Sequence, residues 1–173
     1  IFHLIWQKFL IMRKYFQFNE TISGVNYFLR LLFFIVLLIP VMILFFALVG
    51  KEIMSSGIDV MDPSAVSEIE NDPGLALELV MGTFSTGNII ILIIALIPAL
   101  WFILATVYKR LNALQLRFFP GRLKEVFAFY IIIDFLGLYF NENATIYWII
   151  AIIGLALDLF MIFGNSNIKD HKG

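Results

Sequence analysis

The sequence predicts an all-α, polytopic membrane protein in which four transmembrane helices form a single domain. Hydrophobic residues make up 61% of the chain and charged residues only 14%. Four continuous apolar stretches occupy residues 31–50, 89–108, 126–140 and 145–163. Crossing the hydrocarbon core takes about 20 apolar residues in a helix. Because these stretches are continuous rather than alternating, they are typical of membrane helices and not of barrel strands.

The distribution of basic residues predicts the orientation. All Lys and Arg residues except Lys51 fall on one side of the four stretches. An excess of Lys and Arg marks the cytoplasmic side of a membrane. We therefore expect both termini in the cytoplasm and residues 51–88 outside, as an acidic extracytoplasmic loop.

The segments before and after the first span are less regular. Residues 1–30 are predicted to be a cytoplasmic or interfacial segment, and residues 1–18 alternate bulky apolar and basic side chains, which fits either an interfacial helix or a simple lead into the bundle. Met12 is a candidate natural start, which would make residues 1–11 an extension. In the outer loop, Asp62 and Asp72 each precede a proline, the pattern of a helix N-cap followed by Pro at the first helical position. Two short helices are predicted, over 63–71 and 74–82.

The later segments include one short span. The stretch 126–140 needs its flanks or local thinning of the bilayer to cross. Residues 109–125 form a basic loop on the cytoplasmic side, and 164–173 form a cytoplasmic tail. Basic and aromatic residues interleave in the loop, which predicts contact with anionic lipid head groups or with a partner. The basic residues in question are Lys109, Arg110, Arg117, Arg122 and Lys124.

Two carboxylates interrupt the last two spans and are candidates for function. Asp134 lies on a helical stripe with Tyr130, and Asp158 lies on a second stripe of small or polar residues. An ionisable side chain inside a membrane helix is costly and faces a partner or a cavity. Counting from the intervening turn, the two differ in height by roughly 10 Å, so we do not expect a carboxylate pair. Each fits either an internal salt bridge or helix–helix hydrogen bond, or a step in a proton or ion path.

Signals for catalysis and cofactors are weak. The chain has no cysteine and only two histidines, both outside the predicted spans, and it lacks the short motifs of hydrolases and phosphate loops. We therefore predict no catalytic residues, no cofactor and no metal.

Several short motifs resemble a small bacterial inner-membrane family catalogued only as a domain of unknown function, number eight hundred and five. The motifs are Lys14-Tyr15-Phe16, Phe18-Asn19, Ile22-Ser23, Tyr27-Phe28, Ile97-Pro98-Ala99-Leu100, Lys109-Arg110-Leu111-Asn112 and Phe163-Gly164-Asn165-Ser166-Asn167. The resemblance spans roughly residues 12–173 and implies four membrane helices with no established activity. Glu20-Thr21 and Gly24 stand where the family usually has Gly-Arg and Arg, so no role of those arginines carries over.

Together these features predict a non-enzymatic protein of the bacterial inner membrane, an accessory, assembly or scaffold subunit of a larger complex. Its partners would be anionic lipids and other membrane subunits or further copies of itself, and not nucleic acid. The alternative is a small transporter or ion-conducting oligomer that uses the intramembrane aspartates.

Overall fold

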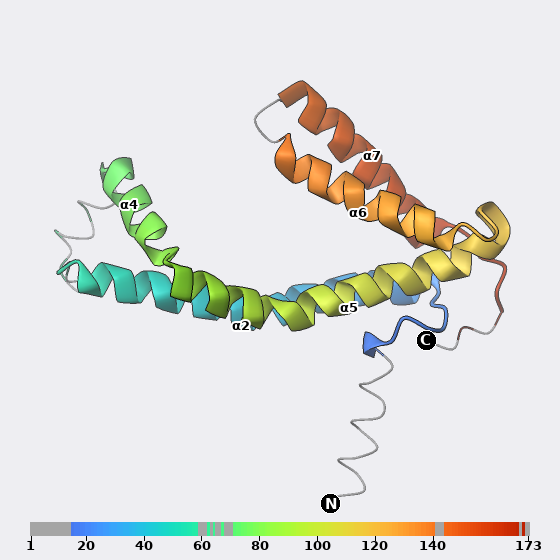
Figure 1. The fold of residues 1–173 in the computed structure, drawn as a ribbon, viewed down its shortest axis with the longest axis horizontal. Coiled ribbons are helices and arrows are strands. Elements are labelled where there is room, and N and C mark those ends of the chain that lie inside the picture. Colours follow the sequence, from blue (N-terminus) through green and yellow to red (C-terminus); the bar gives the residue numbers. More distant parts are fainter. Residues whose placement is uncertain are drawn as a thin grey trace, which may run out of the picture. The chain divides into compact units, whose positions relative to one another are not determined.

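The fold was analysed in a computed structural model, which describes residues 15–58, 62, 64, 67, 71–140, 144–169 and 171. Over these residues the chain is helical and contains no strand, which confirms the predicted all-α class (Figure 1). The helices are α2 (Gly24–Ser55), α4 (Pro73–Thr83), α5 (Thr86–Phe118), α6 (Leu123–Tyr139) and α7 (Ala144–Phe163).

Three of the helices are long and apolar enough to cross a membrane. They are α2, α5 over Thr86–Gln115, and α7. The predicted third span is present as α6, but its 17 residues reach only about 26 Å, slightly less than the hydrocarbon thickness. The chain is therefore a multi-pass membrane protein with three candidate spans, and the four-span count and its orientation stay predictions.

The helices α2 and α5 extend well beyond the apolar stretches that predicted them. They contain 32 and 33 residues, or about 50 Å each, against about 30 Å of hydrocarbon. The predicted basic loop is accordingly helical up to Phe118, and α6 begins at Leu123. Lys, Arg, Leu and Gln are good helix formers, so this helix ends only before Pro120 and Gly121, where Gly121 adopts a φ of +77°.

The chain divides into two compact units. Unit 2, residues 35–100, holds the second half of α2, the helix α4 and the first half of α5. The Asp72 side chain caps α4 by accepting hydrogen bonds from the backbone N–H groups of Gly74 (2.9 Å) and Leu75 (3.1 Å). This confirms the second predicted short helix. The first, over 63–71, falls mostly outside the described residues.

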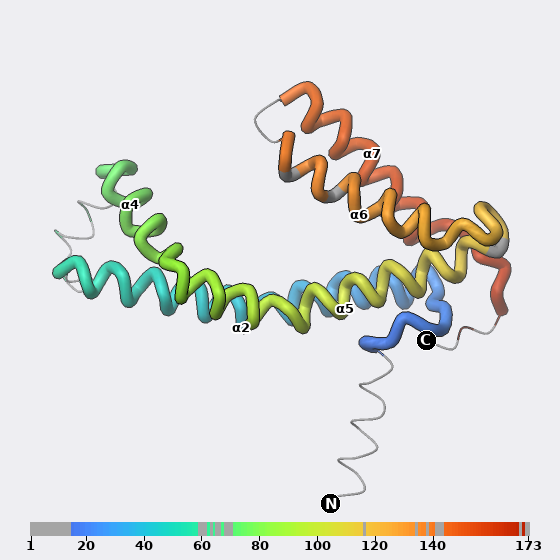
Figure 2. Tube along the Cα trace, viewed as in Figure 1, coloured from blue at the N-terminus to red at the C-terminus, as the bar shows by residue number. Residues whose placement is uncertain are grey.

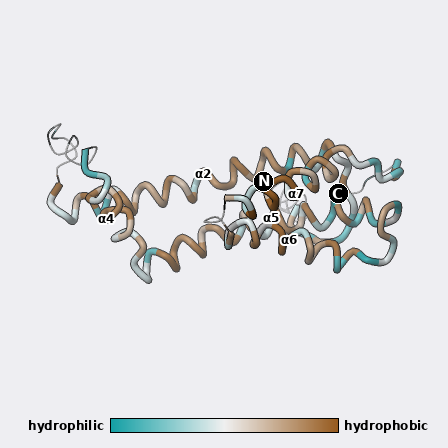
Figure 3. The backbone as a smooth tube through the Cα atoms, turned by 90° about the horizontal axis from the view of Figure 1, so that it is seen from above, coloured by the Kyte–Doolittle hydropathy of each residue, from teal (hydrophilic) through white to brown (hydrophobic). Residues whose placement is uncertain are grey.

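Unit 1, residues 1–34 and 101–173, holds the beginning of α2, the second half of α5, and the antiparallel pair α6 and α7 (Figures 1 and 2). The turn between α6 and α7 lies outside the described residues. The core of the unit consists of Ile22, Tyr27, Val107, Leu111, Leu114 and Met161. It therefore joins α2, α5 and α7 near the ends of their apolar stretches, where polar residues begin (Figure 3).

Candidate functional site

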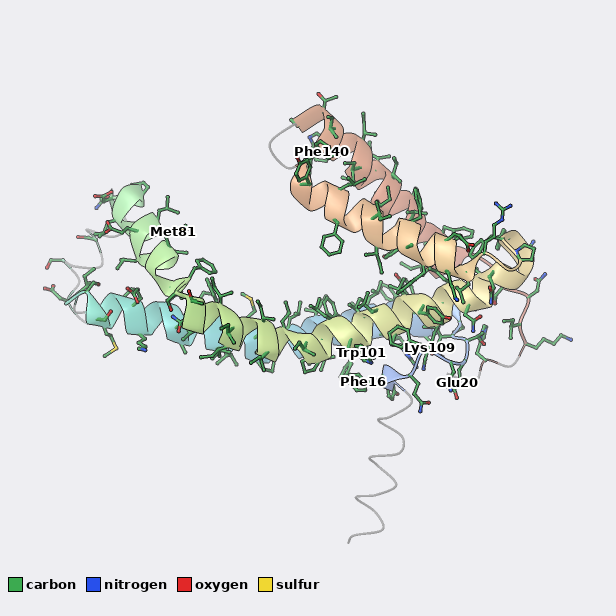
Figure 4. The ribbon with its side chains drawn as sticks, viewed as in Figure 1. Phe16, Glu20, Met81, Trp101, Lys109 and Phe140 are labelled. Carbon is green, nitrogen blue, oxygen red and sulfur yellow. The ribbon has the colours of Figure 1, made fainter. Side chains whose placement is uncertain are left out.

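The residues before α2 lie against α5 and are held by hydrogen bonds to their backbone. We call residues 15–23 the pre-helix segment. The Trp101 indole Nε1 donates to the carbonyl of Phe16 (2.9 Å), and the Asn112 amide donates to the carbonyl of Glu20 (3.1 Å). Figure 4 shows Phe16 beside Trp101, and Glu20 with Lys109, at this part of α5. The pre-helix segment is thus an integral part of unit 1.

Arg110 joins three segments through backbone carbonyls. Its guanidinium donates to the carbonyls of Ile22 (3.1 Å), Met161 (2.5 Å) and Gly164, and the side chain is buried. The last four carbonyls of a helix have no partner within that helix and carry its negative dipole end. Arg110 therefore caps the C-terminus of α7 and ties it to α5 and the pre-helix segment.

A second basic residue of α5 makes an ion pair in the same region. Lys109 is fully buried, and its Nζ lies 3.8 Å from Oε2 of Glu20. Glu20 has a φ of +79°, a left-handed conformation that is uncommon for residues other than glycine. Such a conformation persists only where surrounding contacts hold it, and here the ion pair and the bond from Asn112 do so.

Arg30 is buried beside this pair. Its guanidinium lies 4.7 Å from the centre of the Tyr15 ring, within the range of a cation–π interaction. Only 8% of Arg30 is exposed, and its Nη1 has no hydrogen-bond partner. The fully buried hydroxyl of Thr106 on α5 and Oε2 of Glu20 are likewise without one.

Asp158 is linked to the neighbouring helix. The Tyr130 hydroxyl on α6 donates to Oδ1 of Asp158 on α7 at 2.7 Å, and the Tyr27 hydroxyl on α2 lies 3.5 Å from that of Tyr130. The sequence placed Tyr130 and Asp158 on separate stripes, so their pairing was missed. Asp134 follows Tyr130 by one turn of α6, and its side chain lies outside the described part of the structure.

The described residues of the tail, 164–169 and 171, contact the same end of unit 1. Arg117 donates to the carbonyl of Asn165 (3.0 Å), and the His171 ring lies 3.3 Å from the Thr21 hydroxyl and 3.5 Å from that of Ser166. Burial, and then the positive charge of Arg110, lower the pKa of His171 below its ordinary value. The neutral imidazole is therefore favoured in the docked tail.

The five basic residues predicted to meet lipid head groups separate into two kinds. Lys109 and Arg110 are buried and bonded within the protein, whereas Arg117, Arg122 and Lys124 are exposed. A head-group role stays a prediction for the exposed three. Sequence reasoning missed Arg30, because a basic residue directly before an apolar stretch has the ordinary appearance of a flanking residue.

Comparisons with known proteins do not assign the chain to a family. No match was found among family models, curated proteins or solved structures. The resemblance to the bacterial family of unknown function stays a prediction. Among the described residues, no three His, Asp or Glu side chains lie together as a metal site would require.

Proposed function

We propose that this chain is a non-enzymatic accessory or scaffold subunit of a larger complex in the bacterial inner membrane, with both termini in the cytoplasm. One observation carries the proposal: few residues in the apolar part of the candidate spans are buried by the rest of the chain. The buried share of the most apolar part is 0% for α2, 22% for α5 and 6% for α7.

The way in which unit 1 is built supports this role. Arg110, Asn112 and Trp101 hold the pre-helix segment against α5, and Arg110 also holds α7. These polar side chains are used for architecture, while large apolar side chains point outward along the spans. In lipid, helices associate through close van der Waals packing and not through the hydrophobic effect. A chain with 19 Phe residues, and with one end held together by polar hydrogen bonds, is suited to such packing on neighbouring helices.

The proposal is tested by purifying the tagged full chain from its native membrane in mild detergent and identifying bound proteins by mass spectrometry. A photo-crosslinking amino acid is placed at exposed positions on the three spans, at Phe46, Ile94 and Ile152. We expect crosslinks to a stoichiometric membrane partner from at least one of them. Phe102, which is fully buried, is the matched control and should give none. A protein without partner or crosslink at all three exposed positions would contradict the accessory role.

A small transporter or ion-conducting oligomer is the second candidate. The hydrogen-bonded series Tyr27, Tyr130 and Asp158 favours it, because it links an intramembrane carboxylate to hydroxyls on two other helices. Flux is measured in proteoliposomes for Asp134→Asn and Asp158→Asn, with exposed Glu125→Gln as the control. Loss of flux in either aspartate variant, with assembly intact, is the expected result; unchanged flux in both removes this candidate.

A further inference from the structure

Three buried side-chain atoms in the described part of the chain lack a hydrogen-bond partner, and all belong to one region of unit 1. They are Nη1 of Arg30, Oγ1 of Thr106 and Oε2 of Glu20. Proteins give the large majority of their buried polar atoms a hydrogen bond, so three atoms without one in the same region require a cause, even though Oε2 of Glu20 is ion-paired with Lys109. We call Glu20, Arg30, Thr106 and Lys109 the Arg30 cluster.

The four residues of the Arg30 cluster come together from three segments. Glu20 in the pre-helix segment pairs with Lys109 of α5, and Thr106 lies on the same face of α5 one turn earlier. Glu20 also acts electrostatically on Arg30 of α2. Glu20 thus forms an ion pair with Lys109 and attracts Arg30 only from beyond ion-pair distance. Burying the guanidinium charge of Arg30 is costly unless an anion compensates it.

The Arg30 cluster lies at the ends of two apolar stretches, because Arg30 directly precedes residues 31–50 and Lys109 directly follows residues 89–108, and from this we infer that it sits near the head-group level of a bilayer. It lies where α2 begins and where α5, with its apolar stretch behind it, approaches its end. Aromatic rings of α5 pack on the pre-helix segment nearby: Phe18 lies 5.2 Å from Trp101 and 5.4 Å from Tyr108, measured between ring centres. Tyr and Trp are enriched at this depth of membrane proteins.

We propose that the Arg30 cluster is a binding site for a phosphoryl anion. The planar guanidinium of Arg30 provides N–H donors that match phosphate oxygens, Thr106 adds a hydroxyl donor, and Lys109 contributes a positive charge. Oε2 of Glu20 accepts a hydroxyl group of the same ligand, as a glycerol head group would offer. The phosphoryl group comes either from an anionic phospholipid of the adjoining leaflet or from free phosphate. The site requires only a membrane-embedded chain and does not depend on the accessory role.

The test uses the full chain in phosphatidylcholine nanodiscs, with either phosphatidylglycerol or inorganic phosphate added as the probe. Bound phosphatidylglycerol is counted by native mass spectrometry, and phosphate by its competition with that lipid. We expect wild-type protein to retain phosphatidylglycerol in stoichiometric amount over phosphatidylcholine. Arg30→Gln should weaken this binding about tenfold or more, the usual effect of losing one charge-assisted bond. Thr106→Val should weaken it by a smaller factor, and exposed Arg122→Gln, the same charge change, should leave it unaltered.

The outcomes distinguish a lipid head group from free phosphate as the ligand, and some of them overturn the proposal. Displacement of phosphatidylglycerol by millimolar inorganic phosphate identifies free phosphate as a ligand, whereas retention of the lipid identifies the head group. Equal retention of phosphatidylcholine and phosphatidylglycerol by the wild type, with no effect of phosphate, overturns the proposal. Water would then be the hydrogen-bond partner of the buried polar atoms of the Arg30 cluster. Equal weakening by Arg30→Gln and Arg122→Gln also overturns it, because the attraction would then be general surface charge. The wild-type result decides the matter even if Arg30→Gln fails to fold.

Discussion

Replacing Arg110 with Met should loosen unit 1 more than any change to an exposed basic residue. The substitution keeps a long side chain but removes the three bonds to the carbonyls of Ile22, Met161 and Gly164. Bonds to a charged group contribute about 1.5–3 kcal/mol each in soluble proteins. Side-chain hydrogen bonds within membranes average only about 0.6 kcal/mol. Three bonds therefore give a range of about 2–9 kcal/mol, and we expect about 3 kcal/mol because water at the interface relieves part of the loss.

The measurement is reversible unfolding in mixed micelles with increasing dodecyl sulfate, followed by tryptophan fluorescence. Arg110→Met should lower the free energy of unfolding by about 3 kcal/mol, and Arg110→Lys by less, since lysine keeps the charge but cannot reach three carbonyls with one planar group. Arg122→Met is the matched control and should stay within about 0.5 kcal/mol of wild type. An Arg110→Met value that also lies within that limit would refute the capping role of Arg110.

Three further predictions concern α2, α4 and the tail. Gly24→Ala should cost about 2 kcal/mol in the same unfolding assay, because the added Cβ would overlap the carbonyl oxygen of Ile162. Asp72→Ala should weaken α4 by about 1 kcal/mol, through loss of its N-cap, and should speed amide exchange in the first turn of that helix. The nuclear magnetic resonance titration of His171 should give a pKa below 6.5, so the contribution of the neutral ring to tail docking is fully present above pH 6.5 and is lost as the pH falls through the lowered pKa.

Each of these has a control within the chain. Gly154→Ala adds a methyl group to a position with nothing within 4 Å, so it should not destabilise α7; equal losses at both glycines would contradict the close approach at Gly24. Asp62→Ala removes a side chain that bonds Ser64 and not α4, and should leave exchange in α4 unchanged. A titration of His171 at or above 6.5 would show that the tail does not bury its ring.

The helices with the strongest local signals were predicted well. Uncharged stretches led to α2 and α5 and a long apolar stretch to α7, and all three are long and apolar enough to span a membrane. The Asp72-Pro73 pair led to α4, because N-cap chemistry depends only on neighbouring residues. In each case the physical cause acts over a few turns of one helix. The weaker stretch 126–140 gave α6, whose 17 residues make it shorter than the three candidate spans.

The site was predicted less completely. Asp158 and Tyr130 were both singled out, but their hydrogen bond joins residues 28 positions apart and could not be inferred from the stripes. Lys109 and Arg110 were assigned to a basic cytoplasmic loop in contact with lipid head groups or a partner, yet α5 continues through them and both side chains are buried. Lys and Arg are common in exposed loops but are also good helix formers. Their presence alone therefore does not tell whether a segment is a loop or the continuation of a helix.

The sequence by itself determined that this is a membrane protein and that its secondary structure is helical. Both follow from hydropathy and helix capping, which are properties of contiguous residues. Only the tertiary structure decided which basic residues are buried. Arg30, Lys109 and Arg110 carry the same charge as Arg122, but they lie where the pre-helix segment and the ends of α2, α5 and α7 meet. Backbone carbonyls, the Glu20 carboxylate and the Tyr15 ring offset part of the cost of burying these charges, and only the fold brings them together from distant parts of the chain.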